Sequence, residues 1–150
     1  MRYDNLEVVQ PEDWARPDFF SGSSIPIFLI HDGGGTTFAY HYLDPLYRFV
    51  YGIRNPYFFN HNAAGGLPEM ACSYAKYIMQ TVLQAKFPAK RNSDGSINIL
   101  LGGWSFGGML SLEVAKLLAD DCVVHIVGIL MVDTVYPHVP KDYNGAKVKG

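Results

Sequence analysis

The chain has 150 residues, of which 49% are hydrophobic and 14% are aromatic, enough to build the compact core of one domain. Its formal net charge at pH 7 is −2 and 17% of its residues are charged, so we expect neither nucleic acid nor a membrane surface as a partner. No apolar run approaches the roughly 20 residues that cross a bilayer, and no apolar signal core opens the sequence, so we expect a cytoplasmic protein.

Residues 1–24 contain Pro11, Pro17 and a Ser-Gly-Ser-Ser run at 21–24. Proline and glycine interrupt regular structure, and no sustained hydrophobic period runs through this segment. We therefore predict an irregular leader or interdomain linker over residues 1–24, followed by a folded domain over residues 25–150.

From residue 25 onward, strands and helices alternate. Short apolar runs predict four strands, at residues 25–30, 50–53, 97–101 and 123–132. Apolar residues at helical spacing predict three helices: a short one from residue 37 that breaks near Pro45, a long amphipathic one around 70–83, and one after residue 108. This alternation predicts the α/β class, with a mostly parallel sheet of about four strands, flanking helices and right-handed crossovers.

The strand order decides where a site can form. If the strands at 50–53 and 97–101 lie on opposite sides of the strand at 25–30, the chain connections reverse direction there. Ligands of open α/β sheets bind at such a switch point, at the carboxyl ends of the strands. The two glycine-rich loops of the chain, at 31–35 and 102–108, would then meet at this edge.

The loop at 102–108 contains the pattern Gly-x-Ser-x-Gly, formed by Gly103, Ser105 and Gly107. In a strand, turn and helix context this pattern is typical of a nucleophile elbow, in which a strained turn lifts the serine hydroxyl clear of the backbone and glycines avoid collisions. The alternative is a glycine-rich turn with an incidental serine. We interpret Ser105 as a nucleophile.

The loop at 31–35 begins with His31 and Asp32 and continues with three glycines. A serine nucleophile needs donors for the oxyanion, and we predict the backbone N–H groups of Gly33 and Phe106 for this role. His31, Asp32 and Gly34 would support the loop, His31 through hydrogen bonds.

A tight strand-to-helix connection would also explain the loop at 31–35. Two nucleotide-binding motifs do not fit it. A dinucleotide fingerprint would need glycine at Phe38, and a phosphate-binding P-loop would need a lysine that neither glycine-rich loop carries.

Asp133 ends the last predicted strand, where a carboxylate would orient a histidine and stabilise its charge. The alternative role is a strand-terminal turn former. The general base is harder to assign. His138 follows the acid by five residues, which leaves its ring little room to fold back; His125 begins a strand at the opposite edge of the sheet. His41 and His61 lie upstream.

The two cysteines, Cys72 and Cys122, have neither the spacing of a zinc knuckle nor that of a disulfide framework. We expect two buried free thiols and no metal site.

Taken together, these segments resemble the thioesterase domains that end fungal polyketide synthases and nonribosomal peptide synthetases, which have the α/β-hydrolase fold. The resemblance covers about residues 25–140 and rests on residues 27–35, 102–108 and 131–134. Asp133 lies 28 residues after Ser105. This separation suits such thioesterases, in which the acid closes the strand after the elbow helix; in most esterases and lipases of the fold it comes one strand later.

The resemblance implies release of an acyl or peptidyl chain from the phosphopantetheine arm of a carrier protein in secondary metabolism. The chain would move to Ser105 as an acyl-enzyme and leave by hydrolysis or cyclisation. The implied partner is an acyl or peptidyl carrier protein or a small acyl thioester. No cofactor would be bound by the domain itself.

In this family the lid helices, the last strands and the catalytic histidine follow the acid, whereas the sequence ends at Gly150. We therefore expect residues 25–150 to form an incomplete α/β-hydrolase thioesterase domain, truncated before that histidine. The strand at 123–132 would then leave an exposed sheet edge that favours self-association. The alternatives are an inactive remnant or carrier-protein-binding module, and a general carboxylesterase.

Overall fold

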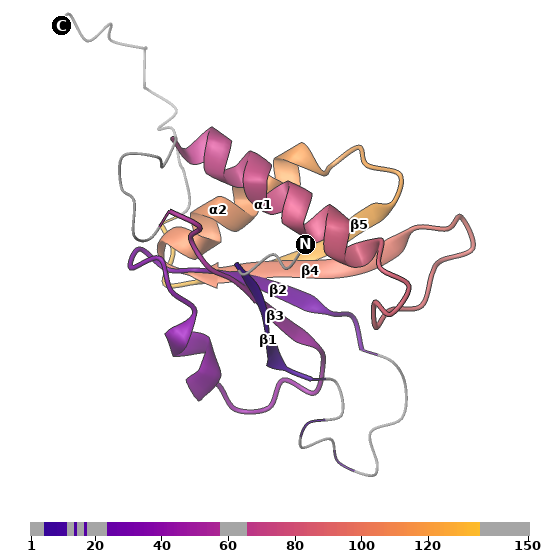
Figure 1. Cartoon of the computed structure of the whole chain (residues 1–150), viewed down its shortest axis with the longest axis horizontal. Coiled ribbons are helices and arrows are strands. Elements are labelled where there is room, and N and C mark those ends of the chain that lie inside the picture. The colour runs from indigo at the N-terminus through magenta and orange to yellow at the C-terminus, as the bar shows by residue number, and fades with distance from the viewer. Residues whose placement is uncertain (1–4, 12–13, 15–16, 18–23, 58–65, 136–150) are drawn as a thin grey trace, which may run out of the picture.

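The computed structural model describes residues 5–11, 14, 17, 24–57 and 66–135. Within them, five strands form one sheet in the order β1-β3-β2-β4-β5 (Figure 1). In chain order the elements are β1 (Leu6–Gln10), β2 (Ile27–Ile30), the 3-10 helix η1 (Phe38–Tyr42), β3 (Val50–Ile53), α1 (Leu67–Val82), β4 (Ile97–Trp104), α2 (Phe106–Leu117) and β5 (Val124–Val132). The neighbouring strands β3, β2, β4 and β5 pair in parallel, and β1 pairs antiparallel with β3.

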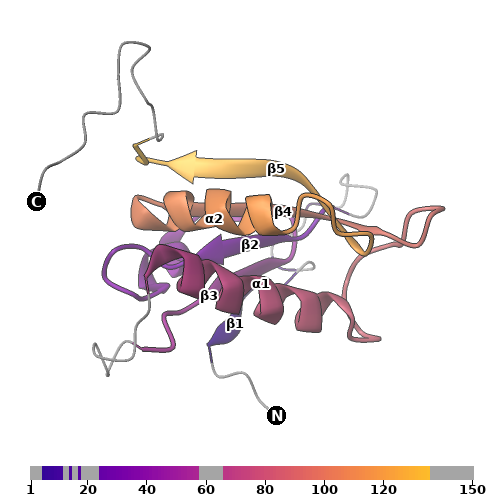
Figure 2. The ribbon, with the colours of Figure 1, turned by 90° about the horizontal axis from the view of Figure 1, so that it is seen from above.

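The strand order confirms the predicted α/β class and the predicted switch point. β2 pairs with β3 on one side and with β4 on the other. α1 and α2 cover one face of the sheet and η1 lies on the other, as Figures 1 and 2 show. None of the helices in the described part of the chain is long and apolar enough to cross a membrane.

The main core lies between the sheet and the two α-helices. Side chains alternate in direction along a strand, so Ile97, Ile99 and Leu101 of β4 all face this layer and are buried. α1 contributes Tyr74 and Ile78 to the same cluster. A smaller cluster on the opposite face joins β2 and β3 to Tyr40 of η1.

The prediction of an irregular leader over residues 1–24 is wrong for β1. This strand pairs with β3 at the sheet edge and buries Gln10. The Gln10 amide nitrogen lies 3.1 Å from the carbonyl of Asp44, and its amide oxygen accepts the N–H of Leu46 at 2.9 Å. A buried polar side chain with both ends satisfied gives no hydrophobic signal, which is why the sequence pattern did not indicate a strand.

The expectation of buried thiols is also wrong. Cys72 and Cys122 are free but exposed. Cys72 lies on the outer surface of α1, and Cys122 lies in the turn that precedes β5.

The turn between β4 and α2 presses against backbone on two sides. A Cβ added to Gly103 would lie 2.3 Å from the carbonyl carbon of Gly107. A Cβ added to Gly107 would lie 2.3 Å from the carbonyl oxygen of Ile30. Real Cβ contacts are never that short, and backbone cannot swing away as a flexible side chain can. Both positions therefore require glycine, and the first turn of α2 sits directly on the end of β2.

Tyr40 enters the sheet where β2 and β4 separate. The N–H of Leu100 donates to the carbonyl of Pro26. Two steps further along the ladder, its two-residue period would bring the N–H of Trp104 to the carbonyl of Ile30. Instead the Tyr40 hydroxyl lies between them: it accepts from Trp104 N at 2.9 Å and donates to Ile30 O at 2.5 Å. One buried side chain thus holds the two strands slightly apart at their carboxyl ends.

Replacing Tyr40 by phenylalanine should destabilise the fold. The variant keeps the ring but leaves the part-buried N–H of Trp104 and the buried carbonyl of Ile30 without the hydroxyl, and an unsatisfied buried group costs about 1–3 kcal/mol. We expect urea titration to show an unfolding free energy lower by about 2 kcal/mol. Tyr42→Phe is the matched control, because Tyr42 lies on the same 3-10 helix with 89% of its surface exposed. Equal effects of the two substitutions would contradict the bridging role.

Gly107→Ala should be strongly destabilising, since its new methyl group would meet the backbone of β2. Overpacking of this kind costs about 1–3 kcal/mol or more. Gly33→Ala is the control, because nothing lies within 4 Å of a Cβ at that position; we expect its unfolding midpoint to stay close to that of the unmodified protein. Thermal unfolding of the two variants side by side measures the difference, and a stable Gly107→Ala protein would refute the close approach.

Candidate active site

Ser105 occupies a strained turn between β4 and α2, as predicted. Its backbone angles are φ 54° and ψ −117°, a left-handed conformation that is costly for any residue except glycine. Its N–H donates to the carbonyl of Val132 at 2.8 Å, and its carbonyl accepts from Gly108 N at 3.1 Å. The residue is exposed, and its hydroxyl does not cap the helix. These features confirm the strand, turn and helix context of a nucleophile elbow.

The loop at 31–35 lies beside this turn. The last register pair of β2 with β4 is Ile30 with Gly103, and a Cβ at Gly107 would lie 2.6 Å from the carbonyl oxygen of His31. The loop is braced by Asp32, whose carboxylate accepts the N–H of Gly34 at 2.8 Å and whose carbonyl accepts the N–H of Gly35 at 3.0 Å. The two glycine-rich loops therefore meet at one edge of the sheet.

His31 supports this loop from inside. Its Nδ1 lies 2.7 Å from the carbonyl oxygen of Asp32 and its Nε2 lies 2.6 Å from the hydroxyl of Tyr74. A carbonyl can only accept, so Nδ1 carries the proton and Nε2 accepts from Tyr74. Burial lowers the pKa of His31, although its hydrogen bond to Asp32 acts in the opposite direction. Both ring nitrogens are thus engaged in hydrogen bonds, and the ring connects the loop at 31–35 to α1 through Tyr74.

Asp133 follows directly after β5, at the same edge. Val132 pairs with Trp104 in the parallel ladder, and the carbonyl of Val132 accepts the N–H of Ser105. Asp133 itself is exposed and has a left-handed φ of 48°. The predicted nucleophile, Ser105, and the predicted acid, Asp133, thus directly follow β4 and β5, two neighbouring strands that stay hydrogen-bonded to each other up to their last residues.

The described histidines do not supply a base for Ser105. His125 pairs with Asn98 near the amino end of β5, at the opposite edge, as expected. His41 lies on η1, where its Nε2 is 3.4 Å from a carboxylate oxygen of Glu7. His61 and His138 fall outside the described residues. Among the described residues, no group of three or more metal-ligating side chains could hold a metal ion.

Three residues of this edge were not predicted: Tyr40, Tyr74 and Thr134. The hydroxyl of Thr134 donates to the carbonyl of Ser105 at 2.9 Å. The two tyrosines contact partners 64 and 43 residues away, so no local pattern could have revealed them. Thr134 had one signal, its place immediately after the candidate acid.

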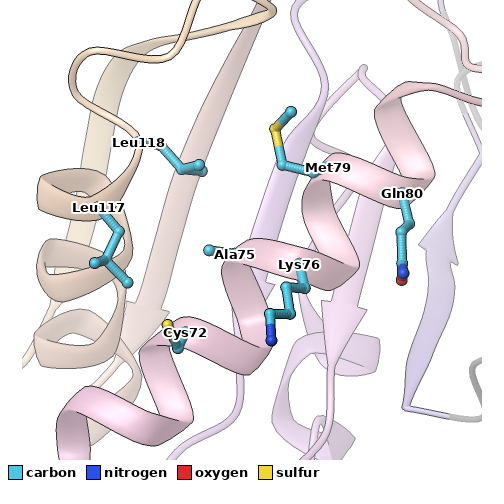
Figure 3. Close-up of a pocket in the computed structure, with 7 residues that line it drawn as sticks. All are labelled: Cys72, Ala75, Lys76, Met79, Gln80, Leu117 and Leu118. Carbon is cyan, nitrogen blue, oxygen red and sulfur yellow. The ribbon is translucent and has the colours of Figure 1, made fainter.

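A groove of about 380 Å³ lies elsewhere, between α1 and α2 (Figure 3). It is lined mainly by apolar groups, among them Ala75, Met79 and Leu117. Leu117 ends α2, whereas Ser105 precedes its first residue. The groove is therefore not part of the candidate site.

Comparison with known proteins identifies relatives by sequence. No protein-family model matches the chain. Thioesterase frbD of Dothideomycetidae sp. (strain 11243) is 41% identical over 117 residues, which cover 77% of this chain and 40% of that protein. The probable thioesterase gloN of Glarea lozoyensis is 42% identical over 123 residues, covering 81% and 39%. The nonribosomal peptide synthetase imqB of Aspergillus flavus is 40% identical over 77% of this chain and 3% of the synthetase.

Solved structures agree with these relatives. The thioesterase domain of NocB from the nocardicin cluster superimposes with a TM-score of 0.59 at 28% identity, covering 73% of this chain and 45% of that chain. YbtT, a type II thioesterase of the yersiniabactin pathway, has a TM-score of 0.63 at 14% identity over 90% of this chain and 49% of its own, which supports the fold alone.

The chain spans about two fifths of the length of the thioesterases frbD and gloN. Over that part, the sequence similarity and the structural superposition point to the same group of proteins. The chain is therefore homologous to part of the thioesterases of polyketide and nonribosomal peptide biosynthesis and has their α/β-hydrolase fold.

Proposed function

We propose that this chain carries the nucleophile and the acid of a thioesterase that releases an acyl or peptidyl chain from the phosphopantetheine arm of a carrier protein. The single observation that supports it best is the left-handed, exposed Ser105 at the strand-to-helix turn, tied by its N–H to the strand that Asp133 follows. Relatives named thioesterases make thioester cleavage the reaction class.

In the proposed reaction Ser105 Oγ attacks the thioester carbonyl as its proton passes to a base. The C–O bond forms, the carbonyl π electrons move to oxygen, and their return expels the pantetheine sulfur, which leaves as a thiol after taking up the proton. Water or a nucleophile of the acyl chain then attacks the acyl-enzyme and regenerates the serine. The base is a histidine not found among the described residues, and Asp133 would orient it and stabilise its positive charge.

The oxyanion donors would be the backbone N–H groups of Gly33 and Phe106. Phe106 is the first residue of α2, so its N–H belongs to the positive end of the helix dipole, which favours a developing negative charge. Contact between Gly107 and the carbonyl of His31 supports a common location for the two donors.

The partner is proposed to be an acyl or peptidyl carrier protein, because imqB is named a nonribosomal peptide synthetase.

A second copy of the chain could also add to the sheet. Within the described residues β5 is the outermost strand on its side, and Val127, Leu130 and Val132 are each about half exposed.

A serine-directed fluorophosphonate tests the nucleophile. A covalent complex with such a compound has been solved for the NocB thioesterase domain. We expect mass spectrometry to find one adduct on this protein, lost in Ser105→Ala, because Ser105 is the one serine among the described residues with a left-handed backbone. Ser73→Ala is the control, since Ser73 lies on α1 and only bonds a carbonyl within its helix. An unlabelled protein would contradict the proposal and favour a carrier-binding module that turns nothing over.

Asp133→Asn tests the acid. Its side chain is exposed, so the circular dichroism spectrum and the unfolding midpoint of the variant should stay near those of the unmodified protein. In a version of the domain extended to include the catalytic histidine, turnover of an acyl-thioester should fall by about 10⁴, because that base loses its orienting and charge-stabilising partner. Asp120→Asn, an exposed acid just past α2, should leave turnover unchanged. Undiminished turnover in Asp133→Asn would remove this residue from the mechanism.

A further inference from the structure

We propose that Thr134 is a positioning residue that locks the turn carrying Asp133 onto the nucleophile turn, in a space kept open by Gly108. The proposal rests on the function proposed above for Ser105 and Asp133. It adds a residue pair whose role the Gly-x-Ser-x-Gly pattern does not include.

The lock consists of hydrogen bonds that run in both directions between the two turns. Thr134 Oγ1 lies 2.9 Å from the carbonyl oxygen of Ser105 and 3.1 Å from that of Val132. In return, the N–H of Ser105 donates to the carbonyl of Val132 at 2.8 Å. Each turn therefore supplies a donor to the other, and Asp133 lies between the two residues, Val132 and Thr134, that make the connection.

Gly108 makes room for this threonine. A Cβ at Gly108 would lie 2.1 Å from Thr134 Oγ1 and 2.9 Å from its Cβ and Cγ2. Gly103 and Gly107 are required by backbone contacts, as described above, whereas the nearest neighbours of Gly108 all belong to the side chain of Thr134. The absence of a side chain at Gly108 therefore provides the space that Thr134 fills.

Backbone strain indicates why such a lock is needed. Ser105 and Asp133 have φ values of 54° and 48°. Conformations of this kind are strained for residues other than glycine and persist only where the surroundings impose them. Without the hydroxyl of Thr134, the chain after Val132 would lose its bond to Ser105, and Asp133 could relax to an ordinary φ that turns its carboxylate elsewhere.

Two substitutions separate the hydroxyl from the size of the side chain. Thr134→Val keeps nearly the same shape without a hydroxyl, and Thr134→Ser keeps the hydroxyl. Two quantities are measured for each: the three-bond HN–Hα coupling of Asp133 by NMR, read together with its intraresidue HN–Hα NOE so that positive and negative φ are distinguished, and the rate of fluorophosphonate labelling of Ser105. Thr81→Val is the control, because Thr81 Oγ1 makes the same kind of bond to a carbonyl within α1, at 2.8 Å.

We expect Thr134→Val to change the Asp133 coupling and to slow labelling by a factor on the order of 10–100, as a small displacement of a catalytic group does. Thr134→Ser and Thr81→Val should match the unmodified protein in both quantities. A Thr134→Val protein with unchanged coupling would overturn the proposal. If the unmodified protein is not labelled at all, the proposed function fails, and the coupling alone then decides the role of Thr134.

Discussion

The candidate site depends on the insertion of one hydroxyl group into a β-ladder. If β2 and β4 continued to pair directly, their carboxyl ends would leave no room for a site between the loop at 31–35 and the turn at Ser105. The hydroxyl of Tyr40 takes up the hydrogen bond that would otherwise join Trp104 directly to Ile30. It lets β2 and β4 diverge while the N–H of Trp104 and the carbonyl of Ile30 both keep a hydrogen-bond partner. The loop at 31–35 and the turn at Ser105 begin immediately beyond it.

Glycine sets the opposite limit on this separation. Gly103 and Gly107 have no Cβ atoms, which allows the first turn of α2 to rest on the backbone of β2. Tyr40 thus separates the two strands, whereas the glycines allow the helix to approach them closely. The edge is thereby shaped by contacts between main-chain atoms. Neutral, buried His31 completes the arrangement by fastening the loop to α1 through Tyr74.

Much of the fold was predictable because it is encoded locally. Four apolar runs predicted β2, β3, β4 and β5, and Gly-x-Ser-x-Gly predicted the turn at Ser105. Features that depend on distant partners were missed. β1 owes its existence to pairing with β3 and buries a glutamine, and Tyr40 meets Trp104 across 64 positions. The exposure of Cys72 and Cys122 depends on which way each residue faces. The roles of Ser105 and Asp133 stay predictions.

The parallel pairing of β2 with β4 has a consequence for how the protein folds. Its register joins residues 73 positions apart, such as Ile27 with Leu100. A long loop must therefore close, at a cost in chain entropy, before this pairing contributes stabilising contacts. α1 and α2 consist of local contacts and can form early, whereas the left-handed turn at Ser105 is supported only after β2 and β5 have joined β4. The edge of the sheet that holds Ser105 should thus be among the last parts of the molecule to acquire its shape.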